Sequence, residues 1–159
     1  MSETTRNKEV GMGEYRVSRG DDVLTALGLG SCVAVGLVDT ESSRCGLAHV
    51  MLPAEEGENS KKHADVLINR LVESMKKRGS DPENLKAKIF GGASMFHNSF
   101  DIGEENIESV KEELDRRDID IVEEDTGGES GRAIWLSCRS GNVVVRKSFE
   151  GTETVEDEE

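Results

Sequence analysis

The chain has 159 residues, 35% of them hydrophobic and 33% charged, which is typical of one globular domain with a strongly solvated surface. Its formal net charge of −13 argues against nucleic acid and anionic membrane surfaces as partners, because both carry charge of the same sign. The sequence holds no run of about 18 to 20 apolar residues and no apolar leader segment, so we expect a cytoplasmic protein without membrane insertion.

Acidic residues outnumber basic ones by 33 to 20, and aromatic residues make up 4% of the chain. This composition keeps a protein soluble in concentrated salt, which screens the repulsion between carboxylates, and it predicts a halophilic source such as a halophilic archaeon. Three cysteines, Cys32, Cys45 and Cys138, are an odd number without the spacing of a disulfide framework. We therefore expect free thiols in a reducing compartment.

The chain is predicted to form a single domain over residues 1–159, with a core from about 11 to 150. Its two ends are polar or acidic, and we expect disordered tails over 1–9 and 151–159. No internal repeat or proline-rich linker interrupts the stretch between them.

The first clear element is a β-hairpin. Two short apolar runs rich in β-branched residues, Val33 to Val38 and Cys45 to Met51, flank a polar turn over 39–44. The clearest helical signal follows, since apolar residues recur three and four residues apart from Ala64 to Met75, with Gly79 beyond a basic last turn.

Further elements are predicted in the rest of the chain: a strand over 86–90, a loop over 91–94, a helix from about 103 to 117, and strands over 119–122, 133–138 and 143–146. Several strands in irregular order with two main helices indicate an α+β fold, a layered sandwich of mixed and antiparallel strands.

The segment Gly28-Leu-Gly-Ser-Cys32 places a thiol at the end of a glycine-rich turn, just before a predicted strand. A catalytic cysteine needs a thiolate, a base, and hydrogen-bond donors for the oxyanion that forms when it attacks a carbonyl. Gly28, Gly30 and Ser31 have small side chains, so a substrate can approach the main chain closely. We expect the amide N–H groups of Gly30, Ser31 and Cys32 to be the oxyanion donors.

His49 is the best placed base among the three histidines. It lies near the end of the returning strand of the hairpin, which brings it beside Cys32, whereas His63 and His97 lie in polar stretches and are expected at the surface. The pattern alone leaves three other interpretations open: Cys32 as a small buried hydrophobe, His49 as a structural histidine, or both with Cys45 as zinc ligands. The zinc interpretation lacks a CxxC pair and a fourth ligand.

Five motifs occur in order between about Gly11 and Lys147: LGLGSCV from Leu27, GLAHVMLP from Gly46, AKIFGGASMF from Ala87, EDTGG from Glu124 and VVVRK from Val143. Together they resemble the CheD family of chemoreceptor glutamine deamidases, and the first two motifs are highly specific. The resemblance implies an α/β sandwich related to the catalytic domain of the cytotoxic necrotizing factor toxins, with Cys32 as nucleophile and His49 as base. It implies deamidation of receptor glutamines to glutamate through a cysteine thioester, without cofactor or metal, in chemotaxis adaptation.

One position departs from the family. A threonine directly before LGLGSC commonly completes a Cys-His-Thr triad by orienting the histidine, but here that position holds Ala26, and Thr25 lies one residue earlier. Because a shift of one residue turns a strand side chain to the opposite face, Thr25 is a candidate third member only where a bulge intervenes.

The resemblance also implies partners: methyl-accepting chemotaxis receptors as substrate, the phosphatase CheC as a competing partner, and through CheC the phosphorylated response regulator CheY. Three side chains in the loop after Gly92, those of Met95, Phe96 and Phe100, are expected either to join a protein-binding surface or to pack in the core.

Other activities stay open. Cleavage of a glutamyl methyl ester through the same thioester is a secondary expectation. The chain can instead be an adaptor that binds CheC or receptors and has lost catalysis with the triad threonine, or a redox sensor in which Cys32 and Cys45 form a reversible disulfide.

Overall fold

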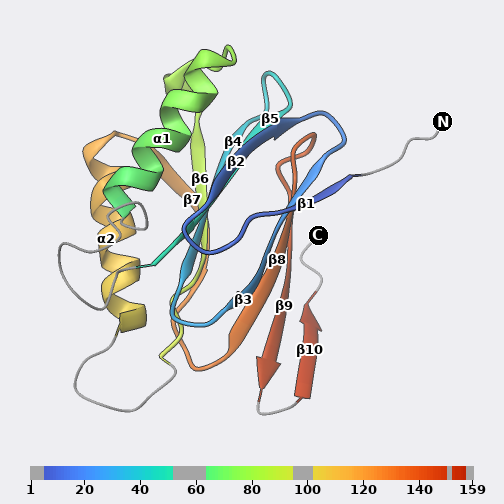
Figure 1. Cartoon of the computed structure of the whole chain (residues 1–159), viewed down its shortest axis with the longest axis vertical. Coiled ribbons are helices and arrows are strands. Elements are labelled where there is room, and N and C mark those ends of the chain that lie inside the picture. The colour runs from blue at the N-terminus through green and yellow to red at the C-terminus, as the bar shows by residue number, and fades with distance from the viewer. Residues whose placement is uncertain (1–5, 52–63, 95–101, 150–151, 157–159) are drawn as a thin grey trace.

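Two five-stranded sheets stack face to face, and two helices cover the outer face of one of them (Figure 1). The computed structural model describes residues 6–51, 64–94, 102–149 and 152–156. This arrangement is the predicted α+β layered sandwich.

The helix-covered sheet has the strand order β2-β5-β4-β6-β7 and is antiparallel apart from the parallel pair of β6 and β7. Its strands are β2 (Tyr15–Arg19), β4 (Val33–Asp39), β5 (Arg44–Val50), β6 (Lys86–Gly91) and β7 (Asp120–Thr126). The connections supply the helices, α1 (Ala64–Lys77) and the 3-10 turn η2 (Pro82–Asn84) between β5 and β6, and α2 (Ile102–Arg116) between β6 and β7.

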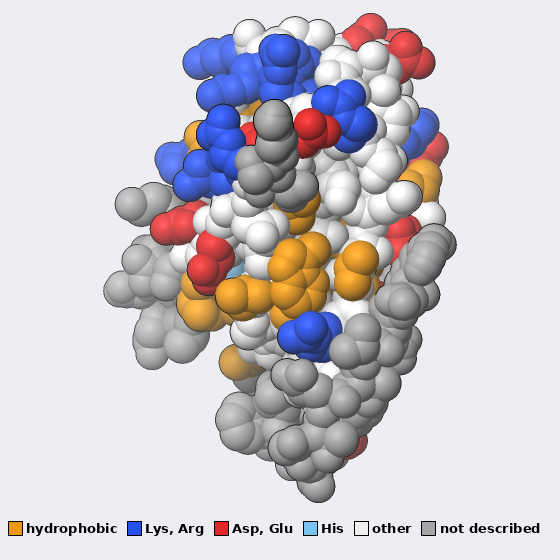
Figure 2. Space-filling view, turned by 90° about the vertical axis from the view of Figure 1, so that its right-hand side faces the viewer, with side chains coloured by type: hydrophobic (Ala, Val, Ile, Leu, Met, Phe, Trp, Pro, Cys, Tyr) orange, Lys and Arg blue, Asp and Glu red, His pale blue; other side chains and the backbone are white. Residues whose placement is uncertain are grey.

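The second sheet, called the open sheet below, has the order β1-β3-β8-β9-β10. Its strands are β1 (Asn7–Glu9), β3 (Val23–Leu29), β8 (Gly131–Ser137), β9 (Val143–Phe149) and β10 (Thr152–Glu156). Neither described helix covers its outer face, and hydrophobic side chains gather at the centre of the side shown in Figure 2.

The hydrophobic core has two layers because β4 is buried on both faces, as its unbroken apolar sequence predicts. Val33, Val35 and Leu37 point toward the helices, where they pack against the apolar stripe of α1. Cys32 and Ala34 point the other way, into the core between the two sheets.

The predicted hairpin and first helix are confirmed. Strand β4 pairs with β5 from Val33 opposite Val50 to Asp39 opposite Arg44, and α1 covers the predicted helix. Four strands, β1, β2, β3 and β10, have no counterpart in the sequence interpretation. Two of them, β1 and β10, fall in segments predicted to be disordered tails, where the chain pairs instead with β3 and β9.

The expectation of free thiols is wrong for two of the three cysteines. Cys45 and Cys138 form a disulfide with a Cα–Cα distance of 4.9 Å, which joins β5 to the end of β8 across the two sheets. The sequence pattern hid this pair because its members are 93 residues apart. Within the described residues, no helix is long and apolar enough to cross a membrane.

The proposed redox pair of Cys32 and Cys45 is also wrong. Cys45 lies opposite Val38, six residues along β4 from Cys32, which places the two cysteines about 20 Å apart at 3.3 Å per residue. A disulfide requires Cα atoms within about 7 Å, so this pair cannot form without rearranging the sheet.

Candidate active site

Cys32 lies directly before β4, with its side chain in the core between the sheets, and is 5% exposed. Its carbonyl oxygen accepts a 2.8 Å hydrogen bond from the amide of Gly92. The main chain at Cys32 is therefore fixed between the start of β4 and the residue that follows β6.

His49 lies on the adjacent strand β5 and is 3% exposed. In the β4–β5 register it is opposite Ala34, and Cys32 precedes Ala34 by two residues on the same face. Positions related by this diagonal lie about 7–8 Å apart, within reach of their side chains. The hairpin thus brings the predicted nucleophile and the predicted base together.

A main-chain carbonyl fixes the histidine ring. His49 Nδ1 lies 3.1 Å from the carbonyl oxygen of Val10, and because a carbonyl can only accept, Nδ1 carries the proton. In this neutral tautomer Nε2 holds a lone pair, and Nε2 is buried without a hydrogen-bond partner among the described residues. The arrangement leaves one nitrogen of the ring available to accept a proton.

Burial lowers the pKa of His49 below its ordinary value of 6.5, and this effect outweighs the opposing hydrogen bond to Val10 and the nearby carboxylates of Glu14 and Glu9. The imidazole therefore remains neutral at neutral pH, which is the state that a general base requires.

The segment that supplies this carbonyl is itself anchored on both sides. The amide of Val10 donates to the carbonyl of Thr25 at 2.8 Å, and the amide of Gly13 donates to the carbonyl of His49 at 2.9 Å. The amide of His49 donates in turn to the carbonyl of Glu14 at 3.0 Å. Residues 10–14 thus form a bracket that links β3 of the open sheet to β5 around the histidine.

The peptide unit before the cysteine is fixed from α2. Asn106 is fully buried, and its Nδ2 donates a 2.7 Å hydrogen bond to the carbonyl oxygen of Ser31. That carbonyl belongs to the same planar unit as the Cys32 amide, and in a trans peptide the two groups point in opposite directions. Asn106 therefore sets the direction of the Cys32 N–H and also polarises it.

Two glycines allow the main chain to pack closely around this turn, Gly91 against Cys32 and Gly103 of α2 against Ala93. Gly91 has φ of 111°, and a Cβ there would overlap the carbonyl oxygen of Cys32. A Cβ at Gly103, near the start of α2, would overlap the carbonyl oxygen of Ala93. The amide of Ala93 also donates to the carbonyl of Gly30 at 2.8 Å, so the whole turn before the cysteine is packed against residues 91–93.

Thr25 is not brought to the site. Leu24 and Ala26 both point into the core between the sheets, so Thr25 between them faces the outer side of the open sheet, opposite Trp135 in the register. The bulge in β3 lies between Ala26 and Leu29, after Thr25, and does not reverse its direction. Thr25 Oγ1 is buried with no hydrogen-bond partner among the described residues.

Several predicted residues lie outside the described residues: His63, His97, Met95, Phe96 and Phe100. In the part of the chain that is described, no group of three potential ligands is arranged to hold a metal ion. Cys45, which the zinc interpretation required, is bonded to Cys138.

Val10 and Asn106 were missed by sequence reasoning. Val10 acts through its carbonyl, which every residue has, so no residue type signals the role. Asn106 stands in a stretch rich in glutamate, so its amide did not attract notice. It nevertheless falls on the buried face of the helix, four residues before Val110, and a buried amide requires a hydrogen-bond partner.

Comparison with known proteins identifies the family of the chain. The family model described as "CheD chemotactic sensory transduction" matches residues 51–147. A Thermotoga maritima protein named "Chemoreceptor glutamine deamidase CheD" is 44% identical over 143 residues, covering 88% of this chain and 91% of that protein. The chain belongs to the CheD family.

Other CheD proteins match over similar lengths. A "Probable chemoreceptor glutamine deamidase CheD" from Methanococcus vannielii is 44% identical over 148 residues, covering 89% of this chain and 96% of that protein. One of the same name from Haloarcula marismortui is 38% identical over 151 residues, covering 91% and 87%. Among solved structures, "Crystal structure of Bacillus licheniformis hypothetical protein YfiH" aligns with a TM-score of 0.48 and 16% identity over 70% of this chain and 49% of that chain.

Proposed function

We propose that this CheD protein deamidates glutamine side chains of methyl-accepting chemotaxis receptors, as the names of its relatives state for them. The observation that carries the proposal is the state of His49: Nδ1 is occupied by the Val10 carbonyl, while Nε2 is unengaged among the described residues and faces the same interior as Cys32. A purely structural histidine would be expected to use both nitrogens.

The reaction begins with proton transfer from the Cys32 thiol to His49 Nε2. The thiolate attacks the carboxamide carbon, and the oxyanion accepts hydrogen bonds from main-chain amides around Gly30, Ser31 and Cys32. As the C–N bond breaks, His49 returns the proton to the departing nitrogen, and ammonia leaves a glutamyl thioester on Cys32.

Hydrolysis completes the cycle. His49 takes a proton from water, the hydroxide adds to the thioester carbon, and the C–S bond breaks. The products are glutamate and a regenerated thiol, so one water is consumed for each ammonia released, and no cofactor enters the balance. A glutamyl methyl ester would form the same thioester with methanol as leaving group, which makes esterase activity a secondary proposal.

The residue that orients the base in this proposal is Val10, through its carbonyl, in the role that the family assigns to a threonine. Because Nδ1 has only one proton to donate, a further side chain at position 26 is not needed. The adaptor alternative rested on the alanine at position 26, and in this proposal that alanine does not prevent catalysis.

Incubation of the full chain with the cytoplasmic fragment of a chemotaxis receptor tests the proposal. Ammonia release and conversion of glutamine to glutamate, followed by mass spectrometry, are expected for the wild type and not for Cys32→Ala or His49→Gln. Conversion by Cys32→Ala would overturn the mechanism. Binding of the receptor without conversion by the wild type would favour the adaptor.

Two further partners, CheC and phosphorylated CheY, belong to the same proposal. CheC is expected to compete with the receptor for this protein and so to couple it to phosphorylated CheY. We also propose that the enzyme acts in the cytoplasm, on the cytoplasmic region of the receptor. A pull-down with purified CheC, with and without the receptor fragment, measures that competition.

A further inference from the structure

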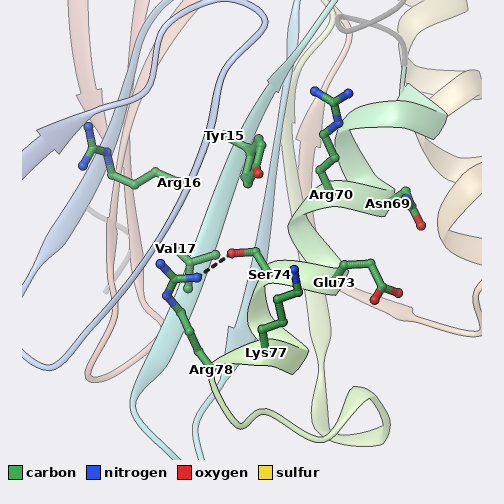
Figure 3. A pocket seen from close by; sticks show the side chains of 9 residues that line it. All are labelled: Tyr15, Arg16, Val17, Asn69, Arg70, Glu73, Ser74, Lys77 and Arg78. Atoms are coloured by element: carbon green, nitrogen blue, oxygen red, sulfur yellow. Dashed lines mark hydrogen bonds between the residues drawn. The ribbon is translucent and has the colours of Figure 1, made fainter.

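A groove of about 690 Å³ lies between β2 and α1, on the helix side of the sheet (Figure 3). Its floor holds Tyr15, which is 38% exposed, and Val17, which packs partly into the core. Its α1 side carries three basic residues and one acidic one, Arg70, Lys77 and Arg78 with Glu73. Arg16 lines the groove on β2, and its side chain points away from α1 (Figure 3).

The charge of this groove is opposite to that of the protein, which has a net charge of −13. Among the described residues, Arg16, Arg70 and Lys77 form no ion pair, and Arg78 donates to the hydroxyl of Ser74 at 2.8 Å. Figure 3 shows Glu73 turned away from β2. Glu73 instead forms a 3.5 Å ion pair with Lys76, which does not line the groove. Like charges gathered without partners repel one another, so this arrangement is suited to an anionic ligand.

The groove continues toward the candidate active site. A second hollow of about 320 Å³ shares Tyr15, Arg16 and Arg70 with the first. Its lining also includes Leu67 and the acidic residue Glu14, together with Val10 and Gly13. These two residues belong to the bracket that holds His49. The groove therefore extends to the segment that holds His49, beside the candidate active site.

The shape of the groove favours a segment of protein over a small anion. Its α1 rim runs from Asn69 to Arg78, about 14 Å at 1.5 Å per residue, so the cations are spread along the groove instead of converging on one point. The aromatic and aliphatic floor offers apolar contact, and β2 is an edge strand with main-chain groups open on one side. Nucleic acid would meet the repulsion of an acidic protein around this small basic area.

We infer that the groove between β2 and α1 binds an acidic stretch of the protein substrate that flanks the glutamine to be deamidated. The inference rests on the proposed function and adds that the enzyme selects substrates with acidic residues near the glutamine. Electrostatic docking of this kind acts on substrate binding and leaves the chemical step unchanged.

Two synthetic peptides test the inference. Both peptides have the same helical sequence with one glutamine. The acidic peptide carries four glutamates, placed one and two helical turns from the glutamine, and the serine peptide carries serines at those four positions. The wild type is expected to deamidate the acidic peptide with a kcat/KM at least tenfold higher than for the serine peptide, because its KM for the acidic peptide is lower. In the variant Arg70→Glu/Lys77→Glu this preference should vanish, because KM for the acidic peptide rises to at least that for the serine peptide.

The matched control is Lys86→Glu/Arg139→Glu, which makes the same change of charge at exposed residues away from the groove and should keep the preference. A preference that persists in the groove variant overturns the inference. Anisotropy of the labelled acidic peptide with Cys32→Ala protein, with and without the groove substitutions, measures docking apart from catalysis. Equal binding of a single-stranded oligonucleotide or full displacement by inorganic phosphate would also overturn it.

The two failures can be told apart. If the wild type deamidates neither peptide nor the receptor fragment, the proposed function fails, and the anisotropy measurement still decides whether the groove binds an acidic segment. If deamidation proceeds equally well for both peptides, the function stands and the groove inference fails.

Discussion

At the scale of residues, the geometry of the candidate base depends on an atom that no substitution can remove. The Val10 carbonyl fixes the tautomer of His49, and Ala26, at the position where the resemblance leads us to expect a threonine, is buried in the core.

Substitutions at positions 25 and 26 distinguish the two arrangements. Thr25→Val removes a buried hydroxyl that has no partner among the described residues and faces away from the site, so kcat/KM should stay within about twofold and stability should not fall. Ala26→Thr should give no gain in kcat, because Nδ1 is already engaged. A loss of about 100-fold in Thr25→Val, measured by ammonia release, would restore Thr25 to the site.

The pH dependence follows from the buried imidazole. Since burial lowers the pKa of His49 below 6.5, the acid limb of the kcat/KM profile should lie below pH 6.5. In the unfolded chain this histidine takes up a proton near 6.5, whereas in the folded chain it does so only at lower pH. Its contribution makes stability fall as pH drops below about 6.5.

Urea denaturation at several pH values checks this sign. The wild type should lose stability between pH 6.5 and the folded pKa more steeply than His49→Gln, which has no imidazole to protonate. A shallower slope in the wild type would contradict the lowered pKa.

At the scale of elements, α2 supports the turn that carries the proposed nucleophile, Cys32. Asn106→Ala removes the donor to the Ser31 carbonyl and should lower kcat about tenfold with little change in KM, because a misdirected Cys32 amide stabilises the oxyanion less well. The carbonyl left unsatisfied should also cost about 1–3 kcal/mol of stability. Steady-state kinetics below the unfolding transition measure the first effect, and urea denaturation measures the second.

Asn142→Ala serves as the comparison, since that amide is exposed in the turn between β8 and β9. A parallel rise of KM and fall of kcat in Asn106→Ala would indicate general distortion of the site. An unchanged kcat would exclude the positioning role.

The sequence predicted those elements whose pattern is local. The hairpin of β4 and β5 and the stripe of α1 follow from alternation and helical spacing, and they were sufficient to bring Cys32 and His49 together. Strand β3 was missed because Gly28 and Gly30 indicate a turn, although Gly28, with φ of 64°, lies within the strand at its bulge. Strand β1 has three polar residues and is defined only by its pairing with β3.

Contacts between distant segments were not predictable in the same way. The hydrogen bond from His49 to Val10 spans 39 residues, and that from Asn106 to Ser31 spans 75. Each depends on how the layers pack, which no local pattern encodes.

At the scale of the whole molecule, the disulfide is the clearest departure from expectation. Replacing Cys45 and Cys138 by alanine should lower the free energy of unfolding by about 2–4 kcal/mol, because the closed loop of 93 residues restricts the unfolded chain. Receptor deamidation at low temperature should be unaffected, since neither sulfur is near Cys32.

Alkylation of the denatured protein checks the bond directly. One cysteine should be labelled without reductant and all three after reduction. Three labelled cysteines without reductant would show that the thiols are not paired.

The position of this bond has a mechanical consequence. Cys32 and His49 are almost fully enclosed between the two sheets. The bond ties the sheets together near the start of β5, whereas His49 lies near the other end of that strand. The two sheets are therefore joined covalently at one end of β5 and through the hydrogen bonds of residues 10–14 at the other, and we expect the two links together to hold a constant spacing of the sheets around Cys32 and His49.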